Sequence, residues 1–237
     1  MKIAMWSGPR NLSTALMYSF ANRADMEAVD EPFYASYLVE TGFDHPMREE
    51  VIASQSAESS KVIERLMSDE DVKHHYQKHM TQHMLASVSR DWMKDVTNVF
   101  LIRHPARVLA SWSNKHDQLS LSDIGFVQQL DLFEHVQNLG KSAVVIDSAD
   151  IRANPEASLR ALCAAIGLDW DPAMLAWEQG PKPYDGVWAA HWYDAVHRST
   201  GFAGAEGELP ELNGELRALN EKALPIYERL AAHKLSI

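Results

Sequence analysis

The sequence predicts a doubly wound α/β protein, with a sheet of about five mainly parallel strands and helices on both faces. Short apolar runs alternate with amphipathic helical patterns along the chain, and this alternation is typical of βαβ units. The first apolar run leads through a Gly-Pro turn directly into a helical pattern. The chain has 237 residues and 46% hydrophobic content, which suffices for one buried core. We therefore expect a single domain over residues 1–237.

Four apolar runs, each bounded by turn or cap signals, predict buried parallel strands. They cover residues 3–6, 26–30, 98–103 and 142–148. Residues 46–92 are polar and helical in pattern, and only 76–80 resembles a strand there. We expect this segment to be a helical insertion.

Helical patterns occupy 13–23, 105–115, 121–138, 155–166 and 211–234, the last with a kink expected at Pro225. The clearest helix is 155–166, because Asn154 can cap it, Pro155 opens it and Gly167 can close it. Residues 180–204 mix Gly, Pro and aromatic residues. This composition predicts an ordered loop.

Charge and cysteine content exclude several classes of protein. A net charge of −11 argues against a broad nucleic-acid surface, which requires a basic face. The single cysteine, Cys163, excludes a disulfide framework and is expected to be a buried helix thiol. No apolar run approaches membrane-spanning length and no signal-peptide pattern is present. We expect a cytoplasmic protein without a membrane partner; the oligomeric state is left open.

The loop SGPRNLST joins the first predicted strand to the first predicted helix. At the carboxyl end of a parallel strand, the N–H groups of the next helix can hold an anion. Gly8 and Pro9 predict a tight turn there. Arg10 supplies a permanent cation, and Ser13 and Thr14 add hydroxyl donors. An ordinary capped strand-to-helix turn would explain these residues equally well.

A second group of residues lies in FLIRHPARVLASW, residues 100–112. Arg103 ends a predicted strand, Pro105 begins a helix, and Ser111 lies about two turns further on. If this helix folds back over the strand end, Arg103 and Ser111 can converge on one phosphate.

Together the two segments resemble the sulfotransferase family, which transfers a sulfuryl group from 3'-phosphoadenosine 5'-phosphosulfate (PAPS). The family binds the 5'-phosphosulfate with a loop spelled like P-K/R-S-G-T-S/T, and four of its positions are matched here, by Pro9, Arg10, Ser13 and Thr14. At the other two, Asn11 replaces serine and Leu12 replaces glycine. We expect Gly8 to supply the flexibility that the loop loses at Leu12.

The resemblance implies a P-loop NTPase-like fold, PAPS as co-substrate and no metal. The family's 3'-phosphate motif has the spacing of Arg103, Pro105 and Ser111. A looser match to a late K-x-x-x-G-x-W element, at Lys182, Gly186 and Trp188, implies that 180–204 covers the nucleotide. Ala15 stands where cytosolic members have a tryptophan that stacks on adenine.

The resemblance also suggests the catalytic groups. Arg10 is expected to stabilise the charge that develops during transfer. Glu31 follows the second predicted strand and precedes Pro32, like the base of carbohydrate-type and several bacterial sulfotransferases. The alternative base is His79 or His83, since cytosolic members carry a histidine some twenty residues before the 3'-phosphate arginine. On a helix, His75, His79 and His83 would also align for zinc, but no acidic partner recurs beside them.

The acceptor is expected to be a hydroxyl or amine of a small molecule or sugar, in a pocket formed by residues 33–75 and aromatic residues of 184–202. Two other functions fit the sequence less well. A kinase would use Asp147 for Mg²⁺, but the lysine and second glycine of its phosphate loop are missing. A non-catalytic nucleotide-binding module is suggested by Leu12 and Ala15 alone.

Overall fold

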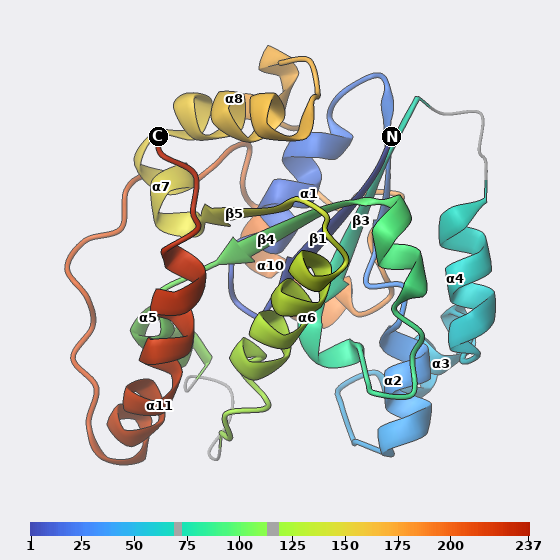
Figure 1. Ribbon diagram of the computed structural model, residues 1–237, viewed down its shortest axis with the longest axis horizontal. Coiled ribbons are helices and arrows are strands. Elements are labelled where there is room, and N and C mark those ends of the chain that lie inside the picture. Colours follow the sequence, from blue (N-terminus) through green and yellow to red (C-terminus); the bar gives the residue numbers. More distant parts are fainter. Residues whose placement is uncertain (69–72, 113–118) are drawn as a thin grey trace.

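The five strands of the computed structural model form one sheet in the order β2-β3-β1-β4-β5, and every neighbouring pair is parallel. The structure describes residues 1–68, 73–112 and 119–237. The strands are β1 (Lys2–Ser7), β2 (Met26–Asp30), β3 (His74–Met80), β4 (Thr97–Ile102) and β5 (Ala143–Asp147). Figure 1 shows helices packed on both sides of the sheet. The predicted P-loop NTPase-like, doubly wound fold class is confirmed.

The helices connect these strands and complete the chain. The α-helices are α1 (Ser13–Ala21), α2 (Tyr34–Thr41), α3 (Arg48–Ser54), α4 (Ser59–Met67), α5 (Pro105–Trp112), α6 (Phe126–Asn138), α7 (Ser148–Ala153), α8 (Pro155–Ile166), α9 (Ala189–Trp192), α10 (Asp194–His197) and α11 (Gly214–Ala231). Short 3₁₀ turns are η1 (Thr81–His83), η2 (Asp91–Asp95) and η3 (Pro172–Leu175).

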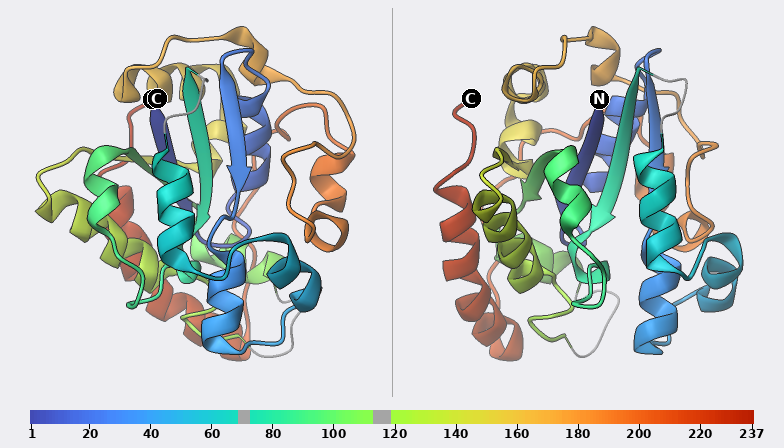
Figure 2. Two further views of the ribbon diagram at one scale, coloured as in Figure 1. Left: turned by 90° about the vertical axis from the view of Figure 1, so that its right-hand side faces the viewer. Right: turned by 45° about the vertical axis from the view of Figure 1, so that its right-hand side comes forward.

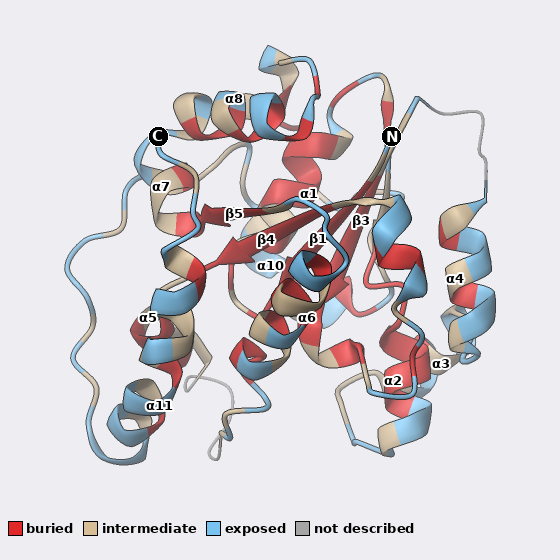
Figure 3. Cartoon of the chain, in the orientation of Figure 1, coloured by how far each residue is buried: buried red, intermediate tan, exposed pale blue. Residues whose placement is uncertain are grey.

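Two buried hydrophobic clusters hold the helices to the two faces of the sheet. On β1, Ile3 and Met5 belong to the cluster that includes α1 and α8, while Ala4 and Trp6 belong to the cluster that includes α6 and α11. This alternation follows from the two-residue period of a strand. The two turned views in Figure 2 show these helix layers on either side of the sheet, and Figure 3 shows that the strands between them are buried.

Strand β3 corrects the prediction of a helical insertion over residues 46–92. Helices α3 and α4 are present, but His74–Met80 forms a strand of seven residues between β1 and β2. Gln77, Lys78 and His79 are buried in it, and each has a buried contact. Gln77 donates to the carbonyl of Leu66 at 3.2 Å, Lys78 binds acidic residues, and His79 stacks on Trp6. The strand resemblance at 76–80 is therefore confirmed, but its polar residues concealed that the strand is central in the sheet.

The strand also removes the basis of the zinc hypothesis. His75 and His79 lie on β3 and His83 lies in η1, so the three imidazoles do not share the helix face on which the zinc hypothesis depended. In the part of the chain that the structure describes, no group of three or more His, Cys, Asp or Glu side chains is placed to hold a metal ion. None of the described helices is both long and apolar enough to span a bilayer.

Most predicted helices are present with shifted ends. The predicted helix 121–138 begins only at Phe126, after Gly125 with φ 72°. The helix predicted over 105–115 is α5, and residues 113–115 lie outside the described residues. Helix α8 matches its predicted bounds, with the side chain of Asn154 accepting from the N–H of Ala157. The last helix continues through Pro225.

The chain passes very close to itself at Gly8, directly after β1. A Cβ at Gly8 would lie 2.7 Å from the carbonyl oxygen of Ile124. Contact at that distance with a backbone atom forces the chain to move. Gly8 is therefore required for packing and is not in the left-handed region, which corrects the expectation that it supplies backbone flexibility.

We expect Gly8→Ala to lower the free energy of unfolding by about 1–3 kcal/mol, the range typical of overpacking. Urea denaturation of the variant measures this. Gly204→Ala is the matched control, because a Cβ there would meet nothing within 4 Å. Equal stability of the two variants would contradict the packing role of Gly8.

Candidate functional site

The loop after β1 has left-handed backbone conformations, and one of them is at Leu12, where a glycine was expected. Arg10 has φ 64° and Leu12 has φ 72°, so both lie in the left-handed region that favours glycine. Leu12 is the N-cap of α1 and provides no side-chain cap hydrogen bond. Leu12 thus adopts a conformation that glycine would adopt without strain. Leu12 also offers the first N–H groups of α1 no side-chain acceptor, which suits an anion site.

Residues from β1, β4 and α5 converge at this loop. Arg10 Nε lies 3.0 Å from Ser111 Oγ, and Arg103 Nη1 donates to the carbonyl oxygen of Arg10 at 2.6 Å. Asn11 is buried and donates to the carbonyl of Leu101, while its Oδ1 has no hydrogen-bond partner among the described residues. Burial and the neighbouring charge of Arg103 lower the pKa of Arg10. The two predicted motifs therefore form one cationic corner at the carboxyl end of the sheet.

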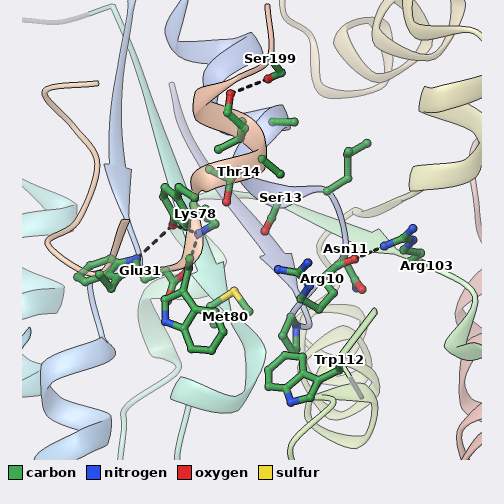
Figure 4. Close-up of a pocket in the computed structure, with 18 of the residues that line it drawn as sticks. Arg10, Asn11, Ser13, Thr14, Glu31, Lys78, Met80, Arg103, Trp112 and Ser199 are labelled. Carbon is green, nitrogen blue, oxygen red and sulfur yellow. Dashed lines mark hydrogen bonds and ion pairs between the residues drawn. The ribbon is translucent and has the colours of Figure 1, made fainter. Parts of the chain in front are cut away.

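This corner opens onto a cavity of about 700 Å³. In Figure 4, Arg10, Asn11 and Arg103 lie on one side of it, and Glu31 and Lys78 lie on the other. Of the predicted site residues, those on its wall are Pro9, Arg10, Asn11, Leu12, Ser13, Thr14, Glu31, His83, Arg103 and Trp188. Ser111 and Gly186 reach the site through neighbours: Ser111 bonds Arg10, and the N–H of Gly186 donates to Asp30 Oδ2 at 3.1 Å.

Opposite the loop lies a buried ionic cluster of Lys78, Asp30, Glu31 and Tyr193. Lys78 Nζ is 2.8 Å from Asp30 Oδ1 and 2.6 Å from Glu31 Oε1. It also lies 2.6 Å from the Tyr193 hydroxyl, which contacts both Asp30 oxygens at 3.0 and 2.8 Å. Lys78 and Asp30 are paired in register across β2 and β3. Since the Lys78 side chain is 1% exposed, the charges compensate one another away from water.

Burial and charge set the protonation of this cluster. Burial raises the pKa of Glu31, and the attraction of Lys78 only partly opposes it. For Lys78, burial disfavours the ammonium, but the two carboxylates more than offset this and raise its pKa. Glu31 is thus a carboxylate of increased basicity at the cavity wall. Its backbone has φ 41°, a strained conformation that is often found at functional sites.

The two candidate histidines lie in different places. His79 points to the opposite side of β3, where it stacks on Trp6 with ring centroids 4.4 Å apart. Burial lowers the pKa of His79 to about 3. His83 lines the cavity and stacks on Tyr34 with centroids 4.6 Å apart, but burial also lowers its pKa well below the usual range. The structure thus brings Glu31 and His83, but not His79, to the cavity.

The segment 180–204 lines the cavity with short helices α9 and α10 and the residues around them. Trp188 donates to the Tyr193 hydroxyl at 3.1 Å. A Cβ at Gly186 would lie 2.1 Å from the Trp188 ring, so glycine allows this ring to occupy its place. Asp185 accepts hydrogen bonds from Tyr18 of α1 at 2.6 Å and from the Lys182 amide at 2.8 Å. The contact with Tyr18 ties the segment to α1.

Sequence reasoning missed Lys78 and Asp30, and it included Tyr193 only among the aromatic residues of 184–202 expected at the acceptor pocket; Tyr193 does line the cavity. Lys78 lies inside the weak strand 76–80, and a charged residue within a buried strand requires an opposite charge nearby. Asp30 and Glu31 at the end of the second predicted strand were the obvious partners. The contacts of Tyr193 with Lys78 and Asp30 could not be predicted, because they depend on the path of an irregular segment.

We expect Lys78→Met to destabilise the protein by about 3–5 kcal/mol near neutral pH, because two buried carboxylates lose their counter-charge. In the variant, the folded-state pKa of Glu31 rises further above its unfolded value, because Lys78 no longer opposes the effect of burial. The stability linked to protonated Glu31 is then lost as the pH rises through the raised pKa. The deficit relative to wild type should therefore be larger at pH 8 than at pH 5.

Urea denaturation at both pH values measures this deficit. Lys61→Met is the control, because Lys61 forms an exposed pair with Glu58 in which both side chains are more than half exposed, and such pairs contribute little. A deficit for Lys78→Met that is the same at both pH values would show that Lys78 acts through packing alone.

Two proteins of Arabidopsis thaliana are similar to this chain in sequence. The chain is 37% identical over 232 residues to branched-chain-amino-acid aminotransferase-like protein 1 of Arabidopsis thaliana, and 34% identical over 235 residues to protein 2 of the same name. Each alignment covers 98% of this chain but only 42% and 41% of the relative. The chain thus spans about two fifths of these relatives, and their name does not state what that part does.

Among solved structures, similar folds are a sulfotransferase from Alicyclobacillus acidocaldarius and sulfotransferase domains from the curacin biosynthetic pathway and from a Synechococcus olefin synthase. Their TM-scores are 0.56, 0.53 and 0.51, at 12%, 13% and 16% identity. The alignments cover 98%, 99% and 94% of this chain, and 96%, 98% and 94% of those chains. At such identities the likeness shows the fold.

The comparison that decides the family is a family model. The model described as a sulfotransferase domain matches residues 1–234, which is nearly the whole chain. The match includes the loop after β1, the Arg103 motif and the segment that lines the cavity. The chain belongs to the sulfotransferase family.

Proposed function

We propose that this protein transfers a sulfuryl group from PAPS to a hydroxyl or amine of a small molecule or sugar. The observation that carries the proposal is the convergence of two anion-binding motifs opposite a buried carboxylate across one cavity. Arg10 and Ser111 lie 3.0 Å apart, and Glu31 lines the same cavity. We further propose that residues 1–237 act as a single domain in this reaction.

The residues present fit the phosphates of PAPS. The uncapped N-terminus of α1, with Arg10, Ser13 and Thr14, offers N–H, guanidinium and hydroxyl donors to the 5'-phosphosulfate. Arg103 and Ser111 take the 3'-phosphate. Because Ala15 stands in place of an aromatic residue, we assign the contact with adenine to Phe202, one of the aromatic residues that line the cavity. Nothing in this assignment requires a metal.

In the transfer, PAPS supplies the sulfuryl group. Glu31 accepts the proton of the acceptor as the acceptor oxygen or nitrogen bonds to sulfur. The bond between sulfur and the bridging oxygen breaks, and its electron pair remains on the 5'-phosphate of the departing adenosine 3',5'-bisphosphate. Arg10 stabilises that negative charge. Lys78 holds the Glu31 carboxylate in place through the 2.6 Å contact.

The acceptor is proposed to bind between Glu31 and the aromatic side chains around it. Tyr34 packs edge-to-face on Trp188 with centroids 5.2 Å apart, and Trp192 also lines the cavity. Flat, largely apolar walls with a few polar groups suit small organic acceptors.

The kinase alternative finds less support. Asp147, its candidate Mg²⁺ ligand, accepts from the Tyr227 hydroxyl at 2.6 Å and from the Ala149 N–H at 2.8 Å. It thereby caps α7 and is not among the residues that line the cavity. A structural role accounts for its position.

We expect Glu31→Gln to lower kcat by at least about a hundredfold, the usual contribution of a general base, while adenosine 3',5'-bisphosphate still binds. His83→Gln is the comparison, because His83 lines the same cavity and is the alternative base. Sulfuryl-transfer assays against a panel of alcohols and amines measure turnover, and calorimetry measures binding. If only His83→Gln abolished turnover, the base would be the histidine.

Donor identity is tested by thermal unfolding with nucleotides. At about 100 times its dissociation constant, a ligand of the native state adds roughly 2.7 kcal/mol of stability. We expect such a shift with adenosine 3',5'-bisphosphate, a smaller one with ATP and Mg²⁺, and turnover that survives EDTA. A larger shift with ATP and Mg²⁺, with turnover lost in EDTA, would favour a kinase.

A further inference from the structure

Three arginines from different elements surround the carboxylate of Glu206. Arg103 Nη2 and Arg152 Nη1 bind Glu206 Oε1, the latter at 2.8 Å, and Arg107 Nε lies 2.9 Å from Oε2. Arg103 follows β4, Arg107 belongs to α5 and Arg152 to α7. The Glu206 side chain is 3% exposed. One carboxylate therefore faces three guanidinium groups, which leaves two positive charges uncompensated within the cluster.

The segment 203–211, which carries Glu206, is attached to the rest of the protein through these arginines. Apart from Glu206 and Pro210, its residues are exposed. Arg152 donates to the carbonyl of Gly204 at 2.9 Å, and Arg107 donates to that of Gly207. We call residues 203–211 the strap. Its attachment consists of acceptor groups presented to arginine, and a stronger anion can compete for such donors.

The three-arginine cluster adjoins the proposed nucleotide site. Arg103 contacts both, since its Nη1 bonds the carbonyl of Arg10 while its Nη2 binds Glu206. Ala203 at the start of the strap lines the cavity together with Arg103. The Glu206 carboxylate thus accepts from arginine donors beside the cationic corner, at one end of the cavity.

We propose that Arg103, Arg107 and Arg152 form a binding site for a phosphate monoester, and that Glu206 is an internal occupant which the 3'-phosphate of the donor nucleotide displaces. A phosphate dianion compensates the excess charge better than one carboxylate, and it offers more oxygens to the arginines. Donor binding then releases the strap. This inference rests on the proposed function and adds Arg107, Arg152 and the competition by Glu206 to it.

Calorimetry with two nucleotides tests the displacement. We expect Glu206→Gln to bind adenosine 3',5'-bisphosphate at least about tenfold more tightly than wild type, because the competing charge is removed. Binding of adenosine 5'-phosphate, which has no 3'-phosphate, should be unchanged. Glu208→Gln is the matched control, since Glu208 is an exposed residue of the same strap, and it should behave like wild type. Arg152→Met should weaken bisphosphate binding alone.

A second measurement keeps Glu206 intact. Leu209 is 51% exposed and Cys163 is 1% exposed, so Leu209→Cys can be labelled selectively with an environment-sensitive dye. Adenosine 3',5'-bisphosphate should change its emission, and adenosine 5'-phosphate should not.

The outcomes separate this inference from the proposed function. Equal or weaker bisphosphate binding by Glu206→Gln, with normal binding by wild type, would overturn the displacement and leave the proposed function standing. Dye emission that does not change when the bisphosphate binds tightly would also overturn the displacement and leave the proposed function standing. If neither wild type nor Glu206→Gln bound the bisphosphate, both the donor assignment and the displacement would be refuted.

Discussion

The ammonium of Lys78 is the group around which the site is arranged. It lies where β3 meets β2, and its contacts to Asp30, Glu31 and Tyr193 join two strand ends to the segment 180–204. Since each of these groups is buried, none can move alone without leaving a charge or hydroxyl uncompensated. The cluster therefore fixes both the carboxylate at the cavity wall and the aromatic segment that closes the cavity. Stability and the geometry proposed for catalysis depend on the same contacts.

The sequence predicted the sheet where its strands were apolar and failed where a strand was polar. The runs at 26–30 and 98–103 correspond closely to β2 and β4, and β4 follows the rule that a strand covered on both faces is usually a continuous apolar run. β3 breaks that rule, since Gln77, Lys78 and His79 are buried in it, and the partners of Lys78 and His79 come from distant parts of the chain. No local pattern records those partners. The position of β3 between β1 and β2 was accordingly invisible to hydropathy.

For the site, the spacing of residues within a motif predicted which residues lie together. The backbone conformation of the loop could not be predicted from the sequence. The spacing of Arg103 and Ser111 placed both near the loop after β1, where Ser111 now contacts Arg10. Leu12 looked like a loss of function because a glycine was expected, yet its backbone adopts φ 72°. Three of the four described non-glycine residues with positive φ, Arg10, Leu12 and Glu31, line the cavity. Such strain is maintained by surrounding packing, which a sequence does not display.

The strand order also determines when the site can exist during folding. Both sheet neighbours of β1, which are β3 and β4, come more than sixty residues after it in the sequence. The loop that carries Arg10 therefore has no hydrogen-bonded partner strand until residue 74 and beyond have been synthesised. Contacts of such sequence separation slow folding, because long loops must close before native pairing stabilises them. Throughout that interval, the apolar residues of β1, IAMW, must not pair with other segments of the nascent chain.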